Sequence, residues 1–246
     1  MLLTQKAYVE GSRALVMFVA QLSDQRHGDT DKQTSSDSSA MVALLTPVLK
    51  AFISDAAVEC TSLAIQVFGG HGYIRETGVE QHLRDCRIIP LYEGSNGIQA
   101  QDLLKRKVLL DGGTALNRLL EQVQAVAGEL AGDEALGDLA EPLRCAVDLL
   151  RQATAGLLAR ADDGRDGAGA VAAPYLRLVG HVCLAWMWAR MAITARAMDA
   201  PGDPLPASKI ATARFYFAKV LPEVHALVRV VAAGAASVMD EDTALA

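Results

Sequence analysis

The sequence predicts an all-α fold in which one helical bundle is followed by a second, up-and-down helical bundle. Apolar residues recur at steps of three and four along most of the chain, which is the period of one face of a helix. Clusters of Gly and Pro interrupt this pattern and mark the ends of helices. The connections between the later helices are short, as they are in an up-and-down bundle.

The first helix is expected over residues 2–23, which are rich in helix-forming residues. The stretch Asp24–Ser39 is full of Ser, Asp, Thr and Gly and buries too little apolar surface to offset the entropy of ordering it, so it is predicted to be a mobile loop. A second helix is expected from about Ala40 to Phe68, with Pro47 in its early turns, where a missing N–H costs least. Its apolar face comprises Leu45, Leu49, Phe52 and Ala56.

Three glycines within four residues, Gly69–Gly72, are predicted to end that helix, because glycine readily takes positive φ. A short helical piece at Val79–Arg84 and an extended piece at Arg87–Tyr92 are expected next. Another helix should then begin near Ser95, whose side chain is a good N-cap, and continue to about Leu110.

Asp111–Gly113 is predicted to be the boundary between two domains, residues 1–110 and residues 111–246. Pro222 falls inside the last predicted helix and is expected to kink it or split it in two. The helices expected in the second domain are at about 114–131, 134–161, 171–199 and 207–239. Breaks between the final three are expected at 162–169 and 201–204.

The composition excludes several classes of protein. The net charge of −6 argues against a nucleic-acid surface, which needs clustered Lys and Arg. The four cysteines lie far apart without a CxxC pair, so neither a disulfide framework nor a metal site is expected. No apolar run approaches the roughly 18 to 20 residues of a membrane span. The start of the chain lacks the layout of a signal peptide, so a cytoplasmic location without membrane contact is expected.

The segment Gln66–Asp102 holds the residues that point to chemistry. Within it, the sequence Glu93-Gly94-Ser95 comes just before a predicted helix start. A carboxylate there can face a ligand with little obstruction, and the free N–H groups of the helix start can bind an oxygen or a phosphate. The same carboxylate can instead be a cap that interacts with the positive end of the helix dipole. The residues alone leave both interpretations open.

Three blocks of this segment together resemble, in order and spacing, the signature of the acyl-CoA dehydrogenase family. They are Gln-Val-Phe-Gly-Gly-His-Gly-Tyr at 66–73, Arg-Asp-Cys-Arg-Ile at 84–88 and Tyr-Glu-Gly-Ser-Asn-Gly-Ile-Gln at 92–99. A lone Gly-Gly-x-Gly would be a weak signal, but the combined pattern is specific. The resemblance covers roughly residues 1–110, which correspond to the family's C-terminal helical domain without part of its opening helix.

The resemblance implies an FAD-dependent enzyme that oxidises an acyl-CoA thioester between its α and β carbons. Glu93 then stands at the position of the base that removes the α-proton, while the β-hydrogen leaves as hydride to the flavin. Two features are expected to help Glu93 to remove this proton. They are hydrogen bonds to the thioester carbonyl, one of them from the Glu93 N–H, and burial of the carboxylate. Tyr92 and Gly94 flank the base and are expected to bind the substrate.

The resemblance also implies cofactor contacts. Gln66, Gly69 and Gly70 match the turn that contacts the ADP part of a flavin bound mainly by the neighbouring subunit, and glycines suit close approach to a pyrophosphate. A plain helix end would explain the glycines but not Gln66. Ser95 stands where the family usually has a Thr on the flavin side. Gly97 departs from the Glu or Gln of many members, so a flavin contact from that side chain is lost.

Other polar residues are expected to be structural. Arg84 and Asp85 should form an orienting salt bridge rather than a catalytic element. His181 and His225 occur in helices near apolar positions and should lie in the core or at an interface.

The part of the chain that follows the Tyr-Glu-Gly block resembles one subgroup of the family. Short members end soon after the Tyr-Glu-Gly block, whereas Lys209–Phe217 resembles a segment of the additional C-terminal domain of larger-subunit members. The resemblance implies that the N-terminal and middle domains are absent, that electron-transferring flavoprotein is the acceptor, and that the chain forms a homodimer. Without those domains the chain alone should be inactive. The alternative is a non-catalytic helical interaction module derived from the family, in which Glu93 is a relic.

Overall fold

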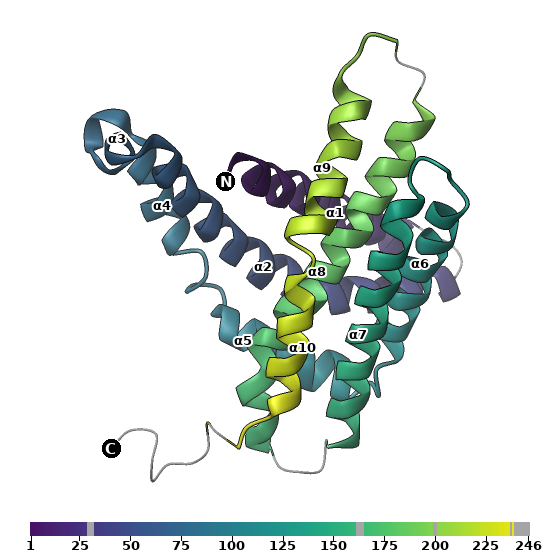
Figure 1. Ribbon diagram of the computed structural model, residues 1–246. Helices are drawn as coiled ribbons and strands as arrows, with labels where there is room; N and C mark the ends of the chain where they lie inside the picture. Colours follow the sequence, from purple (N-terminus) through teal and green to yellow (C-terminus); the bar gives the residue numbers. More distant parts are fainter. Residues whose placement is uncertain (29–31, 161–164, 199–200, 237, 239–246) are drawn as a thin grey trace.

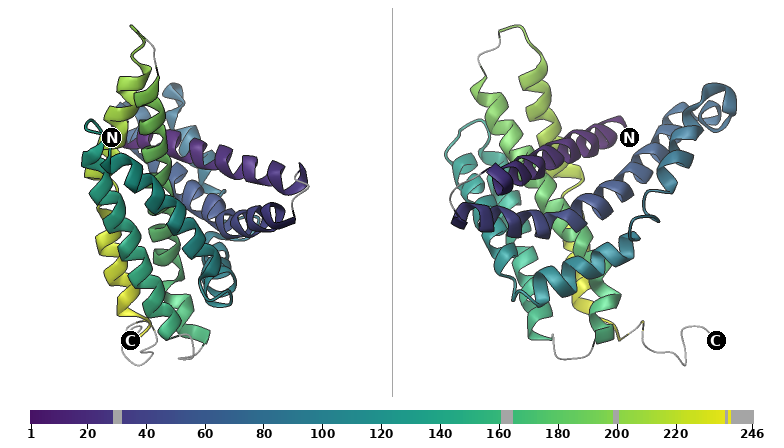
Figure 2. Two further views of the ribbon diagram at one scale, coloured as in Figure 1. Left: turned by 90° about the vertical axis from the view of Figure 1, so that its right-hand side faces the viewer. Right: turned by 180° about the vertical axis from the view of Figure 1, so that it is seen from behind.

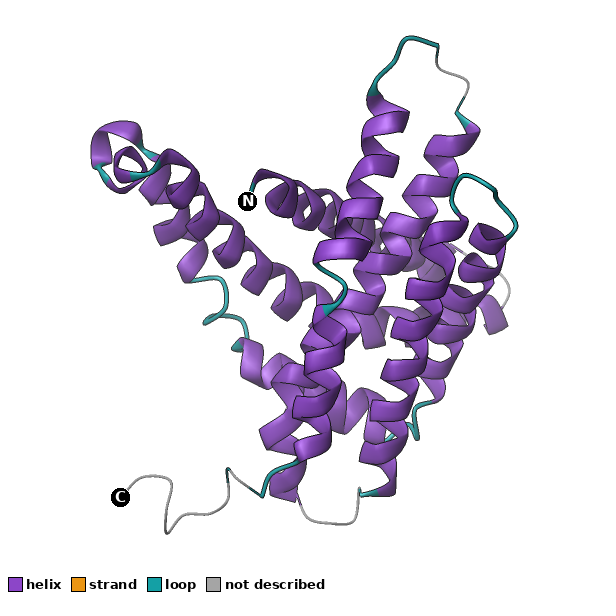
Figure 3. Cartoon of the chain, viewed as in Figure 1, coloured by secondary structure: helices purple, strands orange, loops and turns teal. Residues whose placement is uncertain are grey.

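The computed structural model describes residues 1–246 except 29–31, 161–164, 199–200, 237 and 239–246. Every regular element in the described residues is a helix, which confirms the all-α prediction (Figure 3). The first segment contains α1 (Leu2–Gly28), α2 (Lys32–Phe68), α3 (Gly70–Tyr73), the short η1 (Arg75–Thr77), α4 (Val79–Arg87), α5 (Asn96–Gln101) and the π-helical η2 (Asp102–Leu109).

The polar stretch predicted as a mobile loop, Asp24–Ser39, is helical wherever the structure describes it. α1 continues to Gly28 and α2 already begins at Lys32, while residues 29–31 lie outside the described residues. Local hydrogen bonds serve the polar side chains within the helix: the Ser39 hydroxyl donates to the Ser35 carbonyl at 2.8 Å. Asp37 also accepts a bond from Arg118 of the second segment. Tertiary contacts therefore override the weak helix propensity of this stretch.

Pro47 lies in the interior of α2 rather than in its early turns, because α2 begins earlier than predicted. A proline there removes one backbone hydrogen bond and bends the helix. α2 changes direction along its length and carries its C-terminal half, with α3 and α4, away from the rest of the molecule (Figure 2).

The second segment forms the predicted up-and-down bundle (Figure 1). Pro222 splits the last predicted helix in two, as expected. α8 begins within the predicted break at 162–169, of which residues 162–164 are outside the described part, and the final helix ends earlier than 239. The elements are α6 (Thr114–Ala131), η3 (Gly137–Leu139), α7 (Ala140–Ala159), α8 (Arg165–Ala197), α9 (Leu205–Lys219) and α10 (Glu223–Ala233).

α8 is the element that joins the two segments. It packs against α6, α7, α9 and α10 of its own bundle and also against α1, α2, α5 and η2. Both tryptophans, Trp186 and Trp188, are buried on it, and Trp188 Nε1 donates to the Ala7 carbonyl in α1 at 3.0 Å. The buried apolar side chains of both segments consequently form one continuous cluster.

A half-buried ionic network crosses the same junction. Arg177 on α8 donates to Glu59 on α2 at 2.6 Å and also bonds to Glu223 on α10. His181 is fully buried, as predicted, with Nε2 3.3 Å from Glu223, whereas His225 is exposed and does not lie in the core of this chain. Burial raises the pKa of Glu223, but His181 and Arg177 lower it to about 2, so this carboxylate is ionised at neutral pH.

Gly180 on α8 allows a close contact between the two segments. A Cβ at this position would overlap the ring of Phe52 on α2. We expect Gly180→Ala to lower the free energy of unfolding by about 1–3 kcal/mol, since overpacking outweighs the gain in helix propensity. Urea denaturation followed by circular dichroism measures this difference.

Gly128 provides the matched control for Gly180. It is exposed on α6, and a Cβ there would meet no atom within 4 Å. Gly128→Ala should stabilise the protein by about 0.4–1 kcal/mol. Equal effects of the two substitutions would contradict the close contact at Gly180.

Among the described residues, two helices are long and apolar enough to cross a membrane, which the sequence analysis did not anticipate. They are Ser35–Phe68 and Gly167–Ala197, and an 18-residue window within each has a mean hydropathy of 1.7 and 1.3, respectively. Within the protein, 50% of the window in Ser35–Phe68 and 67% of the window in Gly167–Ala197 are buried. Core helices of soluble proteins meet the same criteria, so these two helices are weak evidence for a membrane protein.

Candidate functional site

The loop that carries Glu93 connects α4 to α5. Residues 88–94 form successive turns rather than the predicted extended piece: Ile89 N donates to Cys86 O at 3.1 Å and Leu91 N to Ile88 O at 2.9 Å. α4 itself continues to Arg87, three residues beyond the prediction. The turns shorten the connection and bring the Glu93 loop onto the side of α2.

Glu93 has a left-handed backbone conformation. Its φ of 54° is the one positive value outside glycine in the described residues, and Gly94 follows with φ 79°. A left-handed conformation costs a residue with a side chain about 1–2 kcal/mol. Such an outlier persists only where its surroundings hold it, and it is often associated with function.

Lys50 on α2 is the first of the residues that hold this loop. Its Nζ donates to the Gly94 carbonyl at 2.7 Å and to the Asn96 side-chain oxygen at 2.8 Å. The Lys50 ammonium group therefore binds Gly94, which follows Glu93, and Asn96, the first residue of α5.

Asn96 completes the attachment to α2. Its Nδ2 lies within hydrogen-bond distance of the Ala51 carbonyl at 3.1 Å, the Ser54 hydroxyl at 2.9 Å and the Asp55 carboxylate at 2.7 Å. Burial raises the pKa of Asp55, an effect opposed by its hydrogen bond from Asn96 and by the charges of Arg177 and Lys50. Together with Lys50, these groups fix the start of α5 against α2; we call Lys50, Ser54, Asp55 and Asn96 the loop clamp.

The N-terminus of α5 is capped as predicted. The Ser95 hydroxyl accepts a hydrogen bond from Ile98 N at 3.4 Å. The Gln99 side chain donates to the Glu93 carbonyl at 3.3 Å, which adds a second support from α5. The position of Gly97 is open, since a Cβ there would meet only the Ser95 hydroxyl at 3.9 Å.

The surface around Glu93 is exposed and largely apolar. The Glu93 carboxylate is exposed and makes no hydrogen bond or ion pair with the described residues, so the burial expected for the base is not supplied by this chain. Tyr92 next to it is 46% exposed. Nearby apolar side chains are exposed as well, namely Ile88, Leu91 and Ile98.

The glycine turn lies at the far end of α2. Gly69 has φ 60° and ψ −143°, a region that is essentially restricted to glycine. A Cβ on Gly72 would collide with the backbone of Ile65. Gly70 is different, because its φ is ordinary and a Cβ would meet nothing within 4 Å, so no described contact requires a glycine. Gln66 before the turn is exposed.

The structure therefore separates the predicted site residues into two groups. Tyr92, Glu93, Gly94 and Ser95 share one loop beside Ser54, whereas Gln66, Gly69 and Gly70 lie at the end of α2. Twelve residues of helix separate Ser54 from Gln66, which corresponds to roughly 18 Å at 1.5 Å per residue. A single chain therefore does not bring the Glu93 loop and the glycine turn together.

The predicted Arg84–Asp85 salt bridge is not present. Arg84 approaches Glu80 at 3.9 Å, and Asp85 accepts a hydrogen bond from Gln81 at 2.6 Å. Successive residues of a helix point in different directions, whereas residues four apart are neighbours, and both observed pairs have that spacing.

The clamp residues on α2 are the functional candidates that the sequence analysis missed. Lys50, Ser54 and Asp55 are polar residues in the mostly apolar stretch 40–58 of α2, a signal that was visible in the sequence. Asn96 lies within the third sequence block, but its several hydrogen bonds to α2 become apparent only in the structure.

Comparison with known protein families gives two matches that together cover most of the chain. The family described as "Acyl-CoA dehydrogenase, C-terminal domain" matches residues 1–108. The family described as "Acetyl-CoA dehydrogenase C-terminal like" matches residues 115–242.

Two characterised relatives resemble the chain over nearly its whole length. It is 39% identical over 230 residues to 3-methylmercaptopropionyl-CoA dehydrogenase of Ruegeria pomeroyi, covering 92% of this chain and 39% of the relative. It is 33% identical over 235 residues to the broad-specificity linear acyl-CoA dehydrogenase FadE5 of Mycobacterium tuberculosis, covering 90% of this chain and 38% of the relative. The chain thus spans about two fifths of these relatives.

Solved structures share the fold. ACDH-11 of Caenorhabditis elegans in complex with C11-CoA superposes with a TM-score of 0.70 at 24% identity, over 97% of this chain and 39% of that one. An acyl-CoA dehydrogenase from Bacillus anthracis complexed with FAD gives 0.72 at 17% identity, over 94% and 41%. With the family matches, these findings identify the chain: it belongs to the acyl-CoA dehydrogenase family, of which it carries the C-terminal helical part.

Proposed function

We propose that this chain supplies the base-bearing C-terminal part of an FAD-dependent acyl-CoA dehydrogenase, with Glu93 as the base that removes the α-proton of an acyl-CoA thioester. The observation that carries the proposal is the left-handed Glu93, presented on the surface at the start of α5 and held there by the loop clamp. A plain helix cap needs neither the unfavourable conformation nor the clamp.

The residues of the chain fit the proton transfer. The Glu93 carboxylate accepts the proton as the Cα–H bond breaks, and the Glu93 N–H donates to the thioester carbonyl, which acidifies that proton. Tyr92 and Gly94 border the substrate on either side of the base. A bound FAD would supply the acceptor for the β-hydrogen, which would leave as hydride together with the electron pair that the substrate loses.

The glycine turn fits a contact with FAD. Gly70 offers bare backbone without any internal reason for a glycine, which suits the close approach of a pyrophosphate. Gln66 and Gly69 lie in the same exposed turn. Ser95, in the Glu93 loop, would contact the flavin there. The separation of roughly 18 Å along α2 supports contacts with two flavins of a homodimer, one through each group.

Further parts complete the proposed enzyme. N-terminal and middle domains would hold most of the FAD and of the acyl-CoA, and would bury Glu93. Exposed apolar side chains on the arm formed by α2, α3 and the Glu93 loop, such as Phe68, Tyr73 and Leu91, offer a surface for these domains or for a second subunit. Electron-transferring flavoprotein would reoxidise the flavin.

We expect the chain by itself to bind FAD weakly, to catalyse no dehydrogenation and to form dimers through its exposed apolar surface. It offers only two separated groups of contacts to a large cofactor. Titration with FAD followed by visible absorbance, dye reduction with an acyl-CoA, and sedimentation measure these properties.

The matched control is the same chain joined to N-terminal and middle domains, which should bind FAD stoichiometrically and reduce the dye. Tight FAD binding by the chain alone would contradict the proposed division of the site. A complete protein that binds FAD but oxidises no acyl-CoA would favour the non-catalytic interaction module instead.

A further inference from the structure

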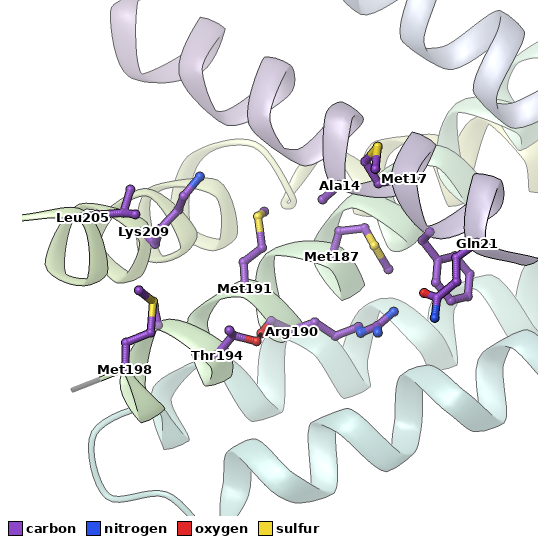
Figure 4. Close-up of a pocket in the computed structure, with 12 residues that line it drawn as sticks. Ala14, Met17, Gln21, Met187, Arg190, Met191, Thr194, Met198, Leu205 and Lys209 are labelled. Carbon is purple, nitrogen blue, oxygen red and sulfur yellow. Dashed lines mark hydrogen bonds between the residues drawn. The ribbon is translucent and has the colours of Figure 1, made fainter. Parts of the chain in front are cut away.

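A groove of about 570 Å³ lies between α1, α8 and α9, on elements that do not carry the Glu93 loop (Figure 4). Its walls are mostly apolar and unusually rich in methionine. Methionine side chains are flexible and polarisable, and they adapt to ligands of irregular shape. The main apolar residues are Met17, Phe18, Met187, Met191, Met198 and Leu205.

Arg190 is the charged side chain that makes one part of this groove different from the rest. It extends from α8 toward α1 (Figure 4), with its guanidinium carbon 5.1 Å from the centre of the Phe18 ring and 5.3 Å from that of Trp186. It is exposed and forms no ion pair with the described residues. Lys209, which also lines the groove, is already paired with Glu10 at 2.8 Å.

An unpaired guanidinium held on two aromatic rings, beside a methionine-lined trough, is complementary to an anion with an apolar tail. Arginine binds carboxylates through two parallel hydrogen bonds. When a guanidinium stacks on an aromatic ring, the N–H groups in its own plane stay free to make these bonds. From Met187 to Ala195 the groove follows eight residues of α8, roughly 12 Å, and it continues to Met198 just beyond the end of the helix. That length accommodates an alkyl chain along the row of methionines.

We propose that this groove binds a single-chain amphiphile with a carboxylate head, such as a long-chain fatty acid, with the carboxylate on Arg190 and the chain along the methionines. The volume is within the range of small-molecule sites. An amphipathic helix is about 10 Å wide or more and would need a longer and broader surface. The proposal is independent of the function proposed for Glu93.

The chain carries its own reporters for a binding experiment. Its two tryptophans lie at the two cationic side chains of the groove, since Arg190 stacks over Trp186 and Lys209 lies 5.9 Å from the centre of the Trp188 ring. Titration with dodecanoate, below its critical micelle concentration, should therefore change the tryptophan fluorescence saturably and raise Tm. The cationic amphiphile dodecyltrimethylammonium should bind at least about tenfold more weakly.

Substitutions test the assigned contacts. Arg190→Gln should weaken dodecanoate binding about tenfold or more, whereas Arg190→Lys should keep part of it. Arg229→Gln, an exposed arginine on α10 that does not line the groove, is the matched control and should have no effect. Met17→Glu, at a side chain that is 69% exposed, should repel dodecanoate and favour dodecyltrimethylammonium.

The outcomes separate the alternatives. Loss of binding in Arg190→Gln and reversal of preference in Met17→Glu support the carboxylate site. Equal binding of both amphiphiles to the wild-type chain, or equal binding of dodecanoate to the wild-type chain and Arg190→Gln, overturns it in favour of nonspecific apolar contact. Absence of saturable dodecanoate binding, with binding of an amphipathic peptide, overturns it in favour of a protein partner.

Discussion

Replacing Glu93 by glutamine in a protein that also carries the flavin-binding domains is expected to slow dehydrogenation about a thousandfold or more, while FAD and acyl-CoA still bind. The amide keeps the size of the side chain and the Glu93 N–H that polarises the thioester, but it cannot accept the α-proton. Stopped-flow reduction of the flavin by an acyl-CoA measures the chemical step, and the absorbance of bound FAD measures cofactor occupancy.

Glu76→Gln is the control for this experiment. Glu76 is an exposed carboxylate of η1, between α3 and α4 and outside the Glu93 loop. Its loss should leave flavin reduction unchanged. If Glu93→Gln reduced flavin at nearly the normal rate, the base would have to be another residue.

The second large effect is expected for Lys50→Met, which removes the cation of the loop clamp. The Gly94 carbonyl and the Asn96 side chain would lose their bonds to α2, and the left-handed Glu93 would lose part of its support. Because displacement of a catalytic group by about 1 Å costs on the order of a hundredfold, kcat should fall by about 10- to 100-fold while KM changes less. Steady-state kinetics with α-deuterated substrate should show a larger isotope effect, since proton abstraction becomes slower.

Two further variants distinguish positioning from general destabilisation. Lys50→Arg retains a cation and should recover part of the rate, whereas Lys219→Met, at an exposed position at the end of α9, should change nothing. A lower Tm in Lys50→Met with normal kcat and an unchanged isotope effect would assign Lys50 a purely structural role.

The sequence predicts the helical fold well because the pattern that specifies it is local. The split at Pro222 and the Ser95 cap both follow from the chemistry of single residues. The predictions fail where distant contacts decide. Asp24–Ser39 reads as a loop by composition, yet part of it is helical and bonded to Arg118 more than eighty residues later.

As with the fold, the sequence predicts those parts of the candidate site that depend on local sequence. The sequence blocks mark Glu93 and the glycine turn, because their spacing is a property of the chain itself. The clamp between Lys50 and Asn96 joins residues 46 positions apart, and the left-handed backbone of Glu93 has no signature of its own. The periodicity of apolar residues therefore predicts neither this contact nor this backbone conformation. The exposure of Glu93 depends on which other parts of the protein pack against it.

The contact between Phe52 and Gly180 has a consequence for how this architecture changes over time. Phe52 is two residues from Lys50 on α2, and Gly180 belongs to the additional bundle. An aromatic ring at one position thus requires the absence of a side chain at the other, so the two should be inherited as a pair. Exchanging the additional bundle between relatives would then require a matching exchange at residue 52. We therefore expect this bundle and α2, the helix that holds the Glu93 loop, to change together.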